Sequence, residues 1–146
     1  MSPISGRGII TENMKTMLIC IDSYENFCAK GKIFHGMRED GAQFANLMQL
    51  LLNIESIIDD TGFPKATTEK RRFHSFAHQE KSGESFGGEY FDFSMKKGAL
   101  ATFRLKVMFR HNASWQGTVA WLEGSTEEPF RSALEFMMLM HSAMVD

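Results

Sequence analysis

Two segments of the chain show the same order of apolar and polar stretches, and each ends in a long apolar run. In the first, a β-rich stretch at 16–22 and a shorter one at 32–35 flank a polar turn, which predicts two strands joined by a tight connection. Residues 43–58 then carry apolar side chains at three- and four-residue spacing, which predicts a helix. The polar residues 59–62 and Pro64 predict its end.

The second segment begins with a clean alternation at 102–110, which predicts a strand with one buried face. The predicted inner face carries Phe103, Leu105, Val107 and Phe109, and the predicted outer face carries Arg104, Lys106 and Arg110. A turn and a second strand follow at 112–122. The capping-box pattern at 125–128 and Pro129 then predict the start of a helix, whose apolar residues run over 130–144.

The two segments align without a gap at an offset of 86 residues. Six of the matched positions pair identical residues: Thr16 with Thr102, Asn26 with Asn112, Gly31 with Gly117, Phe44 with Phe130, Ser56 with Ser142, and Asp60 with Asp146. Any two strand–strand–helix units look alike when aligned, so the constant spacing of elements is the stronger argument. We therefore predict an α+β fold with an antiparallel sheet, built from two ββα repeats whose helices both pack on one face.

The length of 146 residues fits a single domain over 1–146. Within it we expect a flexible leader at 1–13, a first ββα unit at 15–60 and a second at 99–146. Residues 61–98 are rich in glycine, serine and charge over much of their length. This composition predicts a linker, with an additional strand at 70–76.

The most distinctive segment, 109–122, reads FRHNASWQGTVAWL. With the following helix it resembles a family of small uncharacterised bacterial proteins, and the resemblance implies no function. Asn112, Ser114 and Gly117 also match half of the signature of PilZ domains, which bind cyclic di-GMP through an upstream arginine-rich stretch. The wide spacing from the nearest arginine pair and the helix that follows argue against a PilZ domain. The repeat explains Gly117 by turn geometry, since Gly31 is its counterpart.

The net charge of −2 conceals a basic middle. Residues 65–110 hold ten Lys and Arg against five acids, and the rest of the chain holds six against thirteen. Six residues are candidates for contact with phosphate or a partner: Arg71, Arg72, Arg104, Lys106, Arg110 and Trp115. A basic surface of this kind grips phosphate, but an outward sheet face kept soluble by Lys and Arg shows the same alternation. Trp115 is either an exposed contact residue or folds over the sheet edge.

Catalytic and metal signatures are missing from the sequence. No phosphate-binding loop, dinucleotide fingerprint, nucleophile elbow after a strand, or HExxH pair occurs, so we expect no enzyme and no cofactor. His74 and His78 lack further ligands for a metal. Cys20 and Cys28 are too few for a disulfide framework. Because no apolar run is long enough to span a membrane and no secretory signal is apparent, we expect a cytoplasmic protein without a membrane partner.

The helices are more apolar than a one-sided surface helix requires, and 136–140 read Phe-Met-Met-Leu-Met. This favours burial in a second subunit as well as in the core, so we expect a homodimer or another protein as partner. The preferred function is a non-enzymatic interaction or regulatory module. The alternatives are a nucleic-acid or nucleotide-phosphate binding module that uses the basic sheet face and, ranked last, a small-molecule enzyme.

Overall fold

The computed structural model describes residues 16–37, 40–62, 95–111 and 114–145. The predicted leader at 1–13, the predicted strand at 70–76 and most of the predicted linker lie outside these ranges. So do Arg71, Arg72, His74, His78 and Asn112.

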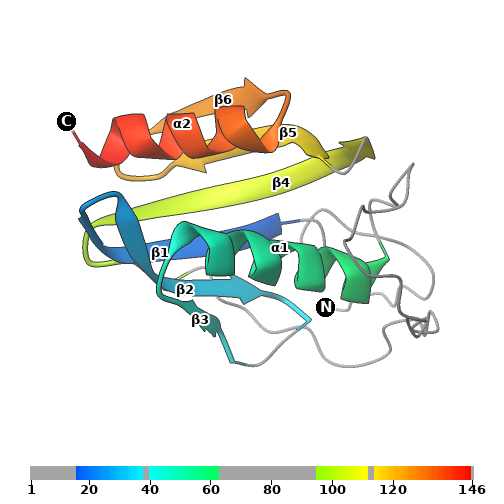
Figure 1. The fold of residues 1–146 in the computed structure, drawn as a ribbon, viewed down its shortest axis with the longest axis horizontal. Helices are drawn as coiled ribbons and strands as arrows, with labels where there is room; N and C mark the ends of the chain where they lie inside the picture. Colours follow the sequence, from blue (N-terminus) through cyan, green and yellow to red (C-terminus); the bar gives the residue numbers. More distant parts are fainter. Residues whose placement is uncertain (1–15, 38–39, 63–94, 112–113, 146) are drawn as a thin grey trace.

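Within the described ranges, six strands form one antiparallel sheet, and two helices accompany it (Figure 1). The strands are β1 (Thr16–Glu25), β2 (Cys28–His35), β3 (Ala42–Phe44), β4 (Ala101–His111), β5 (Ser114–Trp121) and β6 (Thr126–Phe130). Their order across the sheet is β3-β2-β1-β4-β5-β6. The predicted α+β class with an antiparallel sheet is therefore confirmed.

The helices are α1 (Leu47–Thr61) and α2 (Ala133–Met144), and each begins at a side-chain cap. Asn46 accepts a hydrogen bond from the Gln49 amide, and Ser132 accepts one from the Glu135 amide. Such caps satisfy amide groups that have no partner within the helix. α1 packs on β2 and β3, whereas α2 packs on β5, β6 and β4 (Figure 1).

Each half contains a third strand that the sequence pattern did not reveal. β3 is only three residues long, and β6 carries Glu127, Glu128 and Pro129, which are poor strand formers. The prediction of a helix start at Ser125 is wrong, because residues 126–130 pair with β5. Proline is tolerated there since β6 is an edge strand.

The strand registers of the two halves coincide at the offset of 86. Met17 pairs with His35 in the first half, and Phe103 pairs with Trp121 in the second. Both hairpins also shift register at the same place, between Ile21 and Ser23 and between Val107 and Phe109. In the middle of the sheet, Leu18 pairs with Arg104, the residue 86 positions after it in the chain.

One hydrophobic core joins the sheet to both helices. Its helical members are Leu50, Ile54, Ile57 and Ile58 of α1 and Phe136 and Met140 of α2. The sheet contributes alternate residues of the central strands, Ile19 and Ile21 from β1 and Leu105 and Val107 from β4 among them. The apolar 136–140 run is thus divided, with Phe136 and Met140 buried and Met138 exposed.

Gly31 and Gly117 lie inside β2 and β5, so the sequence-based explanation by turn geometry is wrong. A Cβ atom on Gly31 would collide with the carbonyl oxygen of Cys20, and one on Gly117 would collide with that of Lys106. The neighbouring strand approaches too closely for any side chain at these two equivalent positions.

Candidate functional site

Arg110 does not share a surface with Arg104 and Lys106. The register shift after Val107 inserts one extra residue into β4, and such a bulge reverses the alternation beyond it. Arg110 is therefore 6% exposed, whereas Phe109 is 62% exposed. The predicted assignment of Phe109 to the core face and Arg110 to the polar face is wrong for this reason.

The Arg110 guanidinium binds two carboxylates of α1. Its Nη1 lies 2.9 Å from Oε1 of Glu55 and 3.1 Å from Oδ1 of Asp59. The Trp115 indole donates a hydrogen bond of 2.8 Å to the second oxygen of Glu55, and Trp115 is 3% exposed. A buried guanidinium needs such paired acceptors, so both side chains fasten β4 and β5 to α1.

Two further candidates for phosphate contact, Arg104 and Lys106, lie on β4 away from the core. Arg104 is exposed and Lys106 is half-buried on the face of β4 opposite to the core. Arg71 and Arg72 lie outside the described residues. Of the four predicted site residues that the structure describes, Arg110 and Trp115 meet at Glu55, where both side chains are buried.

A second contact, at the opposite end of the sheet, mirrors the Arg110 cluster. The Tyr24 hydroxyl of β1 lies 2.8 Å from Nδ1 of His141 on α2, and the Phe27 ring also contacts the His141 ring. Tyr24 corresponds to Arg110 and Glu55 to His141 at the offset of 86. Each half thus sends a strand residue to the helix of the other half, with different chemistry in the two places.

Exposed apolar side chains occupy matching positions on the two helices. Met48 and Leu52 on α1 are 63% and 56% exposed, and Leu134 and Met138 on α2 are 64% and 59% exposed. Each pair has the i, i+4 spacing that places two side chains on one helix face, and Met48 corresponds to Leu134 as Leu52 does to Met138. We call these four residues the helical apolar set.

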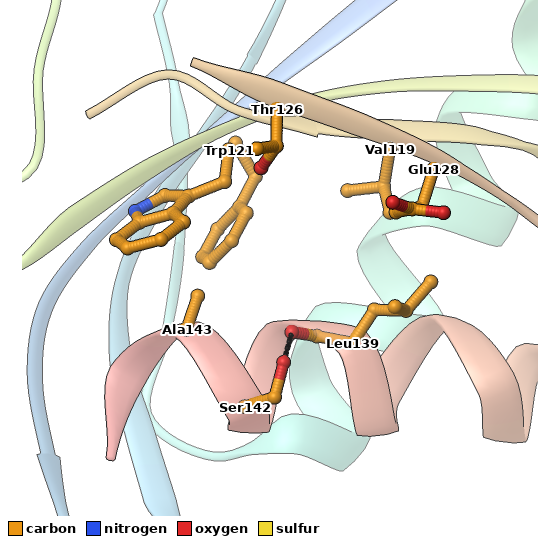
Figure 2. A pocket seen from close by; sticks show the side chains of 8 residues that line it. Val119, Trp121, Thr126, Glu128, Leu139, Ser142 and Ala143 are labelled. Atoms are coloured by element: carbon orange, nitrogen blue, oxygen red, sulfur yellow. Dashed lines mark hydrogen bonds between the residues drawn. The ribbon is translucent and has the colours of Figure 1, made fainter. Parts of the chain in front are cut away.

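A pocket of about 300 Å³ lies between α2 and the strands β4–β6 (Figure 2). Apolar side chains form most of its wall: Phe103, Val119, Trp121, Leu139 and Ala143. Thr126, Glu128 and Ser142 supply the polar atoms, although the Ser142 hydroxyl already donates to the Leu139 carbonyl (Figure 2). The pocket can accept a small, mostly apolar molecule.

Both cysteines are free. Burial raises the pKa of the Cys20 thiol to about 11, and Asp22 and Glu123 add to this. Cys28 is half-exposed, and its thiol donates to the Ala45 carbonyl at 3.0 Å. Cys20 is therefore protonated and unreactive at neutral pH.

The described residues contain neither a cluster of metal-binding side chains nor a helix that could span a membrane. No three His, Cys, Asp or Glu side chains in that part of the chain are grouped so as to hold a metal ion. None of the helices in the described ranges is long and apolar enough to cross a membrane. Comparison with family models, curated proteins and solved structures finds no match to this chain.

Sequence reasoning missed the pocket, the carboxylate partners of Arg110 and the helical apolar set. Glu55 and Asp59 were unremarkable acids at the end of a predicted helix. The offset of 86 could have revealed the apolar set, because Met48 and Leu52 align with Leu134 and Met138. No sequence pattern indicates the bulge that turns Arg110 inward, since the residues around it are ordinary strand formers.

Proposed function

We propose that the protein is a non-enzymatic interaction module that acts through protein–protein contacts, and that it binds a second copy of itself. The observation that carries this proposal is the helical apolar set. Four large apolar side chains remain more than half exposed on two helices whose other apolar residues are buried or partly buried. Clustered exposed apolar side chains are characteristic of contact surfaces.

The proposal includes an internal duplication, with two βββα halves whose helices cover one face of the sheet. The coincident registers and register shifts of the two hairpins support a duplication. The shared core of α1 and α2 supports a common helical layer, as do the contacts from Tyr24 to α2 and from Arg110 to α1. In such a layer the helical apolar set belongs to one surface.

Charge favours a second copy as the occupant of this surface. The last turn of α1 carries Asp60 and Asp59, the second of which already binds Arg110, and neither this turn nor the first contains a base. Arg131, just before α2, has a side chain that is 84% exposed and lies 3.1 Å from the carboxylate of Glu135. If α1 of one copy lies antiparallel to α2 of the other, Arg131 approaches the acidic end of α1, where the helix dipole also favours a cation.

The phosphate-binding alternative has less support. Among the described residues it retains Arg104 and Lys106 of the predicted basic set, because Arg110 is paired with carboxylates. Membership of the family of small bacterial proteins and a cytoplasmic location remain parts of the proposal. The two free thiols support the reducing location.

Sedimentation of matched variants tests the interface. The double variant Leu134→Gln/Met138→Gln should sediment as a monomer at micromolar concentration, because it removes half of the apolar set, while its circular dichroism stays native. Phe109→Gln/Leu100→Gln is the control: it also replaces two exposed apolar residues, but off the helices, and should remain dimeric. Equal dissociation of both variants, or a monomeric parent, would refute the proposed surface.

A further inference from the structure

The pocket beside α2 arises where the two halves of the chain differ. At the offset of 86, Ala143 occupies the place that Ile57 holds in the first half. Ile57 is fully buried and belongs to the core, whereas Ala143 lines the pocket. The same comparison places Trp121 where the first half has His35. A smaller residue opens the space, and a flat indole forms one of its walls (Figure 2).

The chemistry of the lining is mostly apolar with a single charged group. Phe103 and Val119 are buried in the sheet beneath the pocket. Glu128 is the one lining residue with a charge, and Figure 2 shows its carboxylate beside Val119. A carboxylate next to an apolar wall attracts a cation and repels an anion, while the face of an indole also attracts cations.

We propose that this pocket binds a small organic amine, in which an aromatic or branched aliphatic group enters the apolar part and the ammonium group meets Glu128. The volume of about 300 Å³ lies at the lower end of the range for small-molecule pockets, which limits the ligand to a compact one.

The site is separate from the helical apolar set. It uses Leu139 and Ala143 of α2, whereas the exposed pair on that helix is Leu134 and Met138. Amine binding and self-association can therefore succeed or fail independently. A dimer without amine binding refutes only this inference, and a monomer that binds amines refutes only the proposed dimer.

Nuclear magnetic resonance of the full-length chain with benzylamine as the probe tests the inference. The indole N–H of Trp121 is a suitable reporter because it is buried without a hydrogen-bond partner among the described residues, unlike that of Trp115. Benzylamine at millimolar concentration should shift the Trp121 indole and Ala143 methyl signals in a saturable manner. Benzoate, with the same ring and the opposite charge, should not.

Three variants separate the contributions. Ala143→Ile should abolish the benzylamine shifts, because it introduces the larger side chain that Ile57 has at the equivalent position of the first half. Glu128→Gln should weaken binding about fivefold, as expected for a partly solvated ion pair. Glu127→Gln, the same change on the opposite face of β6, should leave binding unchanged. The inference is overturned if benzylamine causes no saturable shift, if benzoate binds equally well, or if Glu128→Gln and Glu127→Gln behave alike.

Discussion

Arg110 and Phe109 exchange the environments that strict alternation assigns to them. The residue inserted after Val107 reverses the direction of the side chains beyond it. The charged residue then faces α1 and finds Glu55 and Asp59, while the aromatic one faces away from the core. A buried guanidinium with two carboxylate partners is costly to disturb, because removing it leaves acids without their counter-charge.

Replacing Arg110 should therefore destabilise the protein. We expect Arg110→Ala to lower the free energy of unfolding by about 3 kcal/mol, measured by urea denaturation. Arg104→Ala, on the exposed face of the same strand, should change it by less than about 0.5 kcal/mol. Similar losses for the two variants would show that Arg110 is not held in the interior.

The two thiols should differ in reactivity. Burial keeps Cys20 protonated, with a pKa of about 11, so in the native protein it should not react with a thiol reagent at pH 8. Cys28 is half-exposed and should react alone. Cys28→Ser should abolish the native-state reaction, and rapid labelling of that variant without denaturant would contradict the buried position of Cys20.

At the scale of elements, the start of α2 is set by Ser132 and not by Ser125. Ser132→Ala should cost about 1 kcal/mol because it removes the hydrogen bond to the Glu135 amide. Ser125 has a positive φ of 54°, which glycine adopts more readily, so Ser125→Gly should cause no loss. Thermal denaturation of both variants checks the two expectations. A larger loss of stability for Ser125→Gly than for Ser132→Ala would instead favour the capping box predicted at 125–128.

Gly31 and Gly117, where neighbouring strands approach each other closely, should be equally intolerant of a side chain. Gly31→Ala and Gly117→Ala should each cost about 2 kcal/mol, as forced overpacking does, because both Cβ atoms meet the carbonyl of the adjacent strand. Urea denaturation measures both losses. A loss at only one of the two positions would contradict their equivalence.

Most of the fold could be predicted from the sequence because the patterned segments are long. The alternation in β4 and the 3/4 spacing in α1 identified a strand and a helix whose ends differ from the prediction by a few residues. β3 and β6 were not predicted, because β3 is very short and β6 carries acids and proline. The candidate sites escaped because they depend on tertiary contacts: Trp115 finds Glu55, 60 residues away in the chain.

At the scale of the whole molecule, the similarities and the differences between the halves point to different surfaces. The matched apolar pairs on α1 and α2 suit contact with a second copy. The unmatched pair of Ala143 and Ile57 lies at the pocket beside α2, where Ala143 lines the space and Ile57 is buried in the core. We thus propose that self-association uses what the halves share, and that ligand binding uses a position where they differ.

The molar mass of the unmodified protein in solution tests the central claim most directly. A chain has a mass of 16.6 kDa, so multi-angle light scattering at micromolar concentration should give twice this value, with dissociation only on further dilution. A mass of one chain that persists as the concentration is raised would contradict self-association through the helical apolar set.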